Sequence, residues 1–255
     1  MFDLTGKVIL VTGTSKGIGA AIVPVLVAQG AQVIAHYGRD LAGAEATVKD
    51  LPPERVTLIG ADFAAPRAAR QLWDEAQAWR GRIDVLVNNA ATLSFEGGFD
   101  DSDAVWDRVW EQSWQINVKS PADLLRGAVR HFRALGGGIV ITISSWNAQR
   151  GSTNPDTIAY AASKAGIMAA TKTVARGFAK QNILAYTIAP GVVRTRLSED
   201  FAARQGGEQA VNAMLAMGEW VPPDDIAALV AFLATGACRH LTGATLDVNG
   251  ASYVR

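Results

Sequence analysis

The stretch VILVTGTSKGIG, from Val8 to Gly19, is the most informative part of the chain. Its first five residues are apolar or β-branched and predict a buried strand, and the Ala-rich segment after Gly19 predicts a helix. Glycines between a strand and a helix lack the Cβ atoms that would keep a backbone away from a pyrophosphate, and free N–H groups at a helix N-terminus hold such an anion. The stretch therefore predicts a dinucleotide-binding turn, with a purely structural glycine turn as the alternative.

Six more short apolar runs follow, and stretches that favour helices separate them. Most of the runs are continuously apolar, which is typical of parallel strands covered on both faces. The alternation predicts an α/β fold, a Rossmann-type doubly wound sheet of seven parallel strands with helices on both faces, as one domain over residues 1–255. The predicted strands are Lys7–Thr12, Gln32–His36, Val56–Ile59, Ile83–Asn88, Gly138–Ile143, Ile183–Ala189 and Ala244–Val248, and two of the predicted helices are Ala64–Trp79 and Ala159–Lys180.

The composition excludes several classes of protein. The 255 residues are 49% hydrophobic, so a full core is available and a disordered chain is excluded. The 24 basic residues balance the 24 acidic ones and form no basic run, which argues against a nucleic acid or a membrane surface as partner. Cys238 is the only cysteine, so we expect no intrachain disulfide and no metal site built on thiolates. No secretory signal or membrane-spanning segment is visible, and we expect a cytoplasmic protein.

Two segments depart from the alternation of strands and helices. Asn147 to Thr157 is rich in Gly, Ser, Asn and Pro and predicts a loop. Residues 192–221 form a longer apolar insertion, which predicts either a lid over a ligand or an ordinary helical hairpin that covers the core. Four large apolar residues in or beside these segments predict an apolar substrate pocket, with core packing as the alternative: Trp146, Met214, Met217 and Trp220.

A series of short motifs, spread in order along almost the whole chain, resembles the short-chain dehydrogenase/reductase family in its single-domain form. The motifs are Thr12-Gly13-Thr14-Ser15-Lys16-Gly17-Ile18-Gly19, Asn88-Asn89-Ala90, Asn117, Ser145, Tyr160-Ala161-Ala162-Ser163-Lys164, Pro190-Gly191-Val192-Val193-Arg194-Thr195 and the tail from Leu241 to Gly250. The resemblance implies an NAD(P)-dependent oxidoreductase that interconverts a ketone and a secondary alcohol. The pattern is similar to 3-oxoacyl-carrier-protein reductases and sugar dehydrogenases of that family.

Tyr160 and Lys164 lie four residues apart on a predicted helix, so their side chains share one face. An ammonium beside a phenol favours the phenolate, and we expect it to lower the pKa of Tyr160 toward the range of a general acid or base. Ser145, at the end of a predicted strand, would hydrogen-bond the same substrate oxygen. Its neighbour Ser144 is the alternative. The resemblance also implies that Lys164 binds the nicotinamide ribose and that Asn117 anchors a water in the proton relay.

The resemblance further implies which residues contact the cofactor and the substrate. We expect substrate contacts from Ser145, Trp146, Asn147 and Tyr160, on a segment between Ser145 and Tyr160 that is about two residues longer than is common in the family. Ala91 stands where the family usually has glycine. The implied cofactor-binding residues are Gly13, Ser15, Lys16, Gly17, Ile18, Gly19, Arg39, Asp62, Phe63, Asn89, Ala90, Tyr160, Lys164, Pro190, Gly191, Val193 and Thr195.

The choice of dinucleotide depends on the end of the second predicted strand. An acidic residue there holds the ribose 2′-hydroxyl of NAD, but Tyr37 occupies that position. Lys16 and Arg39 can converge on a 2′-phosphate instead, so NADP(H) is favoured over NAD(H). Asp40 leaves NAD(H) open if the register shifts by one residue. Asp62 resembles the residue of the family that faces the adenine.

Two other functions remain open. A dinucleotide-binding regulator without catalysis would keep the glycine turn, and a serine hydrolase would use Ser15, because Gly13 to Gly17 also matches a nucleophile elbow. We expect a small-molecule carbonyl or alcohol as substrate. Trp106, Trp110 and Trp114 recur every four residues on one predicted helix, where they either pack against the sheet or support the homotetramer (or dimer) that the resemblance implies.

Overall fold

Seven parallel strands form one sheet in the order β3-β2-β1-β4-β5-β6-β7 in the computed structural model, which describes residues 2–255. The strand order reverses beside β1, as in a doubly wound fold, and the predicted fold class is confirmed. The strands are β1 (Val8–Thr12), β2 (Gln32–Tyr37), β3 (Val56–Gly60), β4 (Val85–Asn88), β5 (Gly138–Ile143), β6 (Ile183–Pro190) and β7 (Thr245–Val248).

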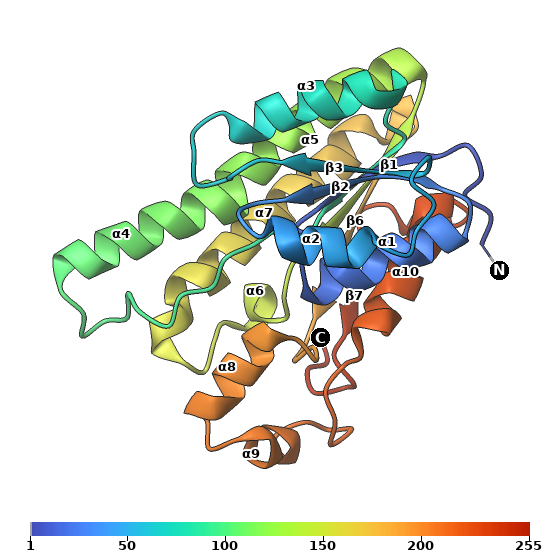
Figure 1. Ribbon diagram of the computed structural model, residues 1–255. Coiled ribbons are helices and arrows are strands. Elements are labelled where there is room, and N and C mark those ends of the chain that lie inside the picture. Colours follow the sequence, from blue (N-terminus) through green and yellow to red (C-terminus); the bar gives the residue numbers. More distant parts are fainter. Residues whose placement is uncertain (1) are drawn as a thin grey trace.

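Helices cover both faces of the sheet (Figure 1). One face carries α1 (Gly17–Ala28), α2 (Leu41–Val48) and α10 (Pro223–Thr235), and the other carries α3 (Ala68–Arg80), α4 (Asp103–Trp114), α5 (Ser120–Leu135) and α7 (Ile158–Phe178). Strand β1 shows why the apolar runs are continuous: Ile9 and Val11 pack into one core, and Val8 and Leu10 into the other. Among the described residues, no helix combines the length and the apolar character needed to cross a membrane.

Two polar side chains shorten the strand that was predicted to begin at Ile83. The carboxylate of Asp84 accepts a hydrogen bond from the main-chain N–H of Val8 at 2.8 Å, and Nε2 of His131 accepts one from the N–H of Ile83 at 3.0 Å. Side chains therefore accept from these two N–H groups in place of main-chain carbonyls, although the main chain of Asp84 still bonds Val8 and Ile139, and β4 begins at Val85.

The segment after β5 is partly helical, so the prediction of a loop from Asn147 to Thr157 is wrong there. It contains the short helix α6 (Asn147–Arg150) and a 3₁₀ turn at Pro155–Thr157. The side chain of Asn154 accepts from the N–H of Asp156, and Pro155 takes the first position of the turn, where its missing N–H costs nothing.

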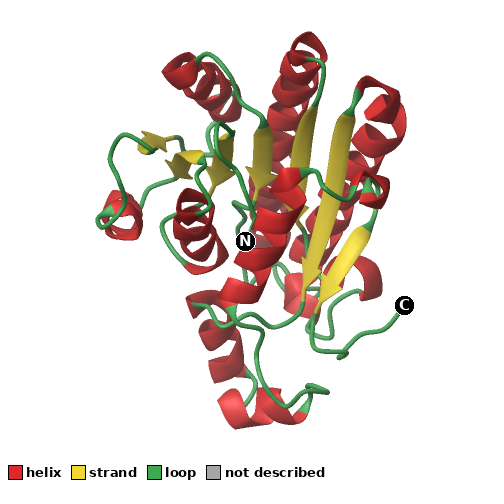
Figure 2. Cartoon of the chain, turned by 90° about the vertical axis from the view of Figure 1, so that its right-hand side faces the viewer, coloured by secondary structure: helices red, strands yellow, loops and turns green. Residues whose placement is uncertain are grey.

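The insertion between β6 and α10 forms two short helices, α8 (Arg196–Arg204) and α9 (Glu208–Ala213). Figure 2 shows them below the sheet, away from the two helical layers. They have a small core of their own, formed by Ala202, Val211 and Trp220. An isolated bridge between Val193 and Val221 closes the base of the insertion. Its role as a lid stays a prediction.

Helix α1 runs through Pro24, which takes a position where the backbone N–H would normally donate to the preceding turn. Nothing in the structure gives this proline a function.

Candidate active site

A cleft of about 520 Å³ opens where the central strands end, as expected for a doubly wound sheet. Its walls come from the segments after β1, β2, β3, β4, β5 and β6 and from α7. All but one of the predicted cofactor-binding residues line this cleft: Gly13, Ser15, Lys16, Gly17, Ile18, Arg39, Asp62, Phe63, Asn89, Ala90, Tyr160, Lys164, Pro190, Gly191, Val193 and Thr195. Gly19 does not line it.

Gly19 lies behind the glycine turn and holds it against β4. A Cβ on Gly19 would lie 2.1 Å from the carbonyl oxygen of Gly13 and 2.7 Å from Nδ2 of Asn89. That Nδ2 donates to the carbonyls of Thr12 (2.8 Å) and Gly13 (3.0 Å). Gly13 and Gly17 have φ of 72° and 59°, in the left-handed region that favours glycine. The turn is thus shaped by close backbone contacts that only glycine permits.

His36 also lines the cleft, and the sequence analysis missed it. It is the last residue but one of β2 and is 1% exposed. Its Nδ1 lies 3.2 Å from the main-chain N of Gly13, and its Nε2 lies 2.8 Å from the carbonyl oxygen of Ala61. The ring stacks on Phe63 with centroids 4.4 Å apart. The signal in the sequence is a single titratable residue at the end of an apolar strand.

Burial lowers the pKa of His36 to about 4, and the hydrogen bond to Ala61 opposes this only in part. The folded state therefore disfavours the charged imidazole, whereas the unfolded chain protonates near pH 6.5. We expect full stability from this group above pH 6.5 and a progressive loss as the pH falls toward 4. The loss reaches about 3 kcal/mol, at 1.36 kcal/mol per pKa unit. Urea unfolding of wild type and His36→Gln between pH 4 and 7 measures it, and equal pH slopes for the two proteins would contradict it.

The groups near the end of β2 bear on the choice of dinucleotide. Lys16 and Arg39 both line the cleft, and Nε of Arg39 donates to Asp62 at 2.8 Å. The hydrogen bond from the N–H of Ala64 is the main cause that keeps the pKa of Asp62 below its usual value. The carboxylate of Asp40 accepts from the N–H of Gly43 at 2.9 Å and so caps α2.

Tyr37, at the position where an NAD-binding acid was considered, does not line the cleft. Its ring lies against Gly60 on the next strand, where an added Cβ would come within 2.8 Å of the phenol oxygen.

Tyr160 and Lys164 share the cleft but are not in direct contact through their polar atoms. Nζ of Lys164 donates to the carbonyl of Ile143 at 2.8 Å and lies 5.9 Å from the centroid of the Tyr160 ring. Burial raises the pKa of Tyr160, although a hydrogen bond with Ser145 opposes this. Burial also lowers the pKa of Lys164 to about 8. The expected acidification of Tyr160 is therefore not found, because the prediction weighed the neighbouring charge and left out the desolvation of both groups.

The two serines at the end of β5 have different partners. Ser144 donates its hydroxyl hydrogen to the main-chain carbonyl of Lys164 at 2.9 Å. Ser145 accepts a hydrogen bond from the N–H of Asn147 at 3.1 Å, and its hydroxyl opposes the rise in the pKa of Tyr160. Ser144 therefore holds α7 through the main chain of Lys164, and Ser145 is the serine whose hydroxyl acts on the phenol of Tyr160.

Asn117 lies in a π-helical turn, Gln115–Lys119, that joins α4 to α5. It is 2% exposed and lies outside the cleft lining. Its Oδ1 accepts from the N–H of Thr92 at 2.8 Å, and its Nδ2 donates to the carbonyl of Thr92 at 2.9 Å and to Ser163 at 3.0 Å. The amide oxygen and one amide hydrogen thus hold the Thr92 segment in the cleft wall, and the other hydrogen holds Ser163 on α7. The predicted role in anchoring a water stays a prediction.

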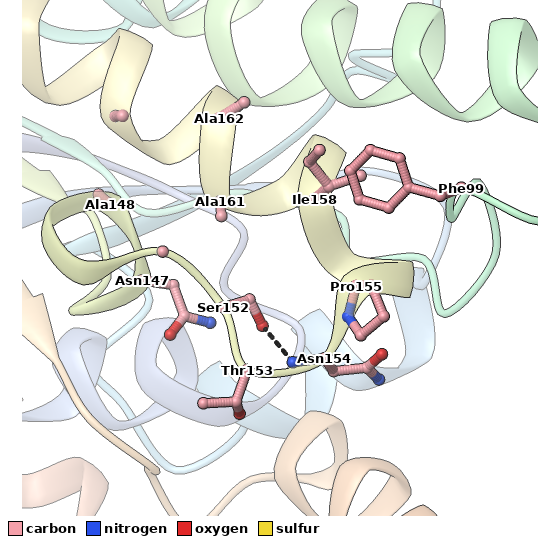
Figure 3. A pocket seen from close by; sticks show the side chains of 12 residues that line it. Phe99, Asn147, Ala148, Ser152, Thr153, Asn154, Pro155, Ile158, Ala161 and Ala162 are labelled. Carbon is pink, nitrogen blue, oxygen red and sulfur yellow. Dashed lines mark hydrogen bonds between the residues drawn. The ribbon is translucent and has the colours of Figure 1, made fainter.

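Two of the predicted substrate contacts, Trp146 and Asn147, do not line the cleft. Trp146 lies against Gly191, where an added Cβ would come within 3.4 Å of the indole ring. The guanidinium of Arg150 lies over the same ring, 4.3 Å from its centroid. Asn147 points into a separate pocket of about 420 Å³ between α6 and α7 (Figure 3). That pocket is lined mainly by the segment Gly151–Pro155, by alanines of α7 and by Phe99.

The three large apolar residues of the insertion that were considered for a substrate pocket, Met214, Met217 and Trp220, do not line the cleft either. Trp220 is 3% exposed within the small core of the insertion, while Met214 and Met217 are 61% and 65% exposed. The alternative that they line a substrate pocket therefore finds no support in their positions.

The comparisons with known proteins agree with this arrangement. A sequence profile described as "Enoyl-(Acyl carrier protein) reductase" matches residues 13–251. The chain is 32% identical over its whole length to 2-dehydro-3-deoxy-D-gluconate 5-dehydrogenase of Escherichia coli, of which it covers 98%. A further relative is human dehydrogenase/reductase SDR family member 4, which is 32% identical over 99% of this chain and 89% of the relative. This chain is a short-chain dehydrogenase/reductase.

Solved structures of the short-chain dehydrogenase/reductase family include close matches to the fold. A 3-oxoacyl (acyl-carrier-protein) reductase from Agrobacterium tumefaciens, solved with NADP bound, superposes with a TM-score of 0.88 at 31% identity, over 98% of this chain and 95% of that one. As a short-chain dehydrogenase/reductase, the chain is an oxidoreductase that uses a nicotinamide dinucleotide and acts on a small molecule.

Proposed function

We propose that the chain interconverts a ketone and a secondary alcohol with NADP(H) as cofactor and Ser145, Tyr160 and Lys164 as its catalytic residues. The observation that carries the proposal is that these three side chains line the same cleft as the glycine turn. Each residue type is common by itself, but a phenol, an amine and a hydroxyl beside a dinucleotide turn are together suited to one kind of reaction. They can bind a carbonyl oxygen and exchange a proton with it.

The cleft fits a nicotinamide dinucleotide. Its lining extends from the cations Lys16 and Arg39, past the glycine turn, to Tyr160 and Lys164. The N–H groups that open α1 would hold the pyrophosphate, and Lys164 would hold the nicotinamide ribose. When bound, the nicotinamide supplies or accepts the hydride, which no protein side chain can do.

The protein's own part is to bind the substrate oxygen and to move its proton. The phenol of Tyr160 has a raised pKa and holds its proton at neutral pH, so it can donate this proton to a carbonyl oxygen. The hydroxyl of Ser145, which lines the cleft together with the phenol, would bind the same oxygen and stabilise the charge that develops on it. The amine of Lys164, with a pKa of about 8, becomes protonated close to neutral pH and favours the phenolate that remains.

NADP(H) is proposed over NAD(H) because the two cations near the end of β2, Lys16 and Arg39, line the cleft and both acids beside them have other partners. Asp40 and Asp62 also line the cleft, but Asp40 caps α2 and Asp62 pairs with Arg39. Tyr37 packs against Gly60. The Agrobacterium relative, whose structure holds NADP, supports the same choice.

Removal of either cation tests this choice. We expect Lys16→Ala and Arg39→Ala to weaken NADPH binding about tenfold or more each, because a charge-assisted hydrogen bond contributes about 1.5–3 kcal/mol. NADH binding should stay unchanged. Fluorescence titration with both nucleotides measures the effect, and Lys49→Ala, which removes an exposed charge outside the cleft, is the control. Tight NADH binding with negligible NADPH binding by the wild type would refute the preference.

The activity itself is tested by a screen of the preferred nucleotide against ketones, sugars and acyl thioesters. Consumption of the nucleotide by at least one of these classes supports the proposal. Binding without any turnover would instead favour the regulator without catalysis. The serine hydrolase has no support, because Ser15 donates its hydroxyl hydrogen to the main-chain carbonyl of Asp40 at 2.7 Å and has no hydrogen bond to a basic side chain in the described part of the chain.

A homotetramer or dimer is part of the proposal by resemblance. The tryptophans of α4 are not buried against the sheet: the ring of Trp106 contacts those of Phe99 and Trp110 at tilted angles, and Trp114 is 50% exposed. Phe99 is 69% exposed beside them. An aromatic surface of this kind supports contact with another subunit.

A further inference from the structure

We propose that His36 is a positioning residue for the dinucleotide, because its neutral ring fixes the first amide of the glycine turn to the end of β3. The inference rests on the proposed dinucleotide site. It assigns a function to a side chain that the sequence motifs do not include.

The hydrogen bonds determine which ring nitrogen carries the proton. A main-chain N–H can only donate, so Nδ1 of His36 must accept from Gly13 through its lone pair. The hydrogen is then on Nε2, which donates to the carbonyl of Ala61. A doubly protonated ring would direct a second N–H at the N–H of Gly13 and break this contact. The depressed pKa of His36 agrees with the neutral form.

The ring therefore joins three strand ends around the cleft. The main-chain carbonyl of His36 accepts from the N–H of Thr14 at 2.9 Å and from its hydroxyl at 3.1 Å. Together with the bond from Gly13, these contacts hold two successive residues of the turn against β2. The stack on Phe63 and the bond to Ala61 hold the ring against the segment after β3. Gly13 has a positive φ and its N–H bonds to His36, so the orientation of this amide depends on a neighbour outside the turn.

The protonation state of the ring is set by the groups that face it. Those are the Gly13 amide from the turn, the Ala61 carbonyl and the Phe63 ring from the segment after β3, and no charged side chain hydrogen-bonds the imidazole in residues 2–255. Arg39 and Asp62, the nearest charges along these segments, pair with each other. The imidazole thus stays uncharged around neutral pH. It affects cofactor binding through the position of the Gly13 amide and not through a charge.

Two substitutions separate the two hydrogen bonds of the ring. Asn at position 36 places an amide oxygen near the place of Nδ1 and can accept from Gly13, but it does not reach Ala61. Gln reaches Ala61 with its terminal NH₂ and leaves the Gly13 amide without an acceptor. Both variants lose the stack on Phe63, so they lose similar stability, and the difference between them isolates the bond to Gly13.

We expect His36→Gln to weaken binding of NADPH and NADH alike by about 3- to 10-fold, the effect of one hydrogen bond, and His36→Asn to stay within about twofold of the wild type. The KM for the cofactor should rise in His36→Gln with kcat little changed, because the bond acts on binding and not on the proton step. Amide hydrogen exchange of residues 12–19 should be faster in His36→Gln than in His36→Asn, with no nucleotide present.

The exchange measurement distinguishes a failure of this inference from a failure of the proposed function. If the wild type binds neither nucleotide, the proposed function fails, while the exchange comparison still tests whether His36 fixes the turn. Equal exchange in the two variants, or equal weakening of nucleotide binding in both, overturns the positioning role and leaves His36 as a residue that only stabilises the fold.

Discussion

Replacement of Tyr160 by Phe is expected to lower kcat by about 10²–10⁴-fold, the usual contribution of a positioned general acid. The variant keeps the ring and its packing and loses only the hydroxyl, which lines the cleft together with Ser145. Because Lys164 is held by the carbonyl of Ile143 and not by the phenol, the cofactor-binding side of the cleft should be unchanged. The Kd for NADPH is therefore expected to stay within about twofold of the wild-type value, as for a residue that acts only in the chemical step.

Steady-state kinetics and nucleotide titration on the same preparation measure both values. Tyr186→Phe is the matched control, since it removes a phenol hydroxyl whose partner, the carbonyl of Cys238, lies outside the cleft lining. Turnover near the wild-type level in Tyr160→Phe would remove Tyr160 from the mechanism. A parallel loss of turnover and nucleotide affinity would make it a binding residue instead.

Replacement of Gly19 by Ala is expected to have the largest effect on the dinucleotide turn. The added Cβ would lie 2.1 Å from the carbonyl oxygen of Gly13, a backbone atom that cannot move without opening the turn. Overpacking of this kind costs about 3 kcal/mol. That cost corresponds to a decrease of roughly a hundredfold in an equilibrium constant. The decrease falls on folding, on nucleotide binding, or partly on each. Urea unfolding and NADPH titration measure the two parts.

Gly177 provides the control for this substitution, because it lies in α7 with nothing within 4 Å of an added Cβ. Gly177→Ala should gain about 0.4–1 kcal/mol of stability by restricting the unfolded chain, and should bind NADPH like the wild type. If Gly19→Ala unfolds and binds like Gly177→Ala, the tight packing of the turn is not important for either property.

The fold could be predicted from the sequence because strand and helix signals agree along the chain. The run from Val8 to Thr12 is apolar on both faces, and both faces are indeed covered. The start of β4 could not be predicted, because the side chain of Asp84 accepts the hydrogen bond of the Val8 N–H. Val8 lies in a distant part of the sequence, so no local pattern reveals this contact. Helix α6 was missed because its four residues are outweighed by the glycine, serine and proline signals that follow.

The sequence predicted that the three proposed catalytic residues lie together, but it did not predict their pKa shifts. The motif positions and their order placed Ser145, Tyr160 and Lys164 in one cleft with the turn. Spacing on a helix gives the distance between two side chains but not their desolvation, so the direction of the pKa shift of Tyr160 was missed. His36 was missed because its partners, Gly13 and Ala61, come from two other segments and are both main-chain groups, which leave no trace in a motif.

The division of labour between Ser144 and Ser145 makes this end of β5 intolerant of slippage in either direction. A shift of β5 by one residue in either direction would move both hydroxyls away from these partners. It would also turn the side chains of the strand to the opposite face of the sheet, where its alternate residues meet different cores. The length of β5 is thus fixed by the site and by both cores at once.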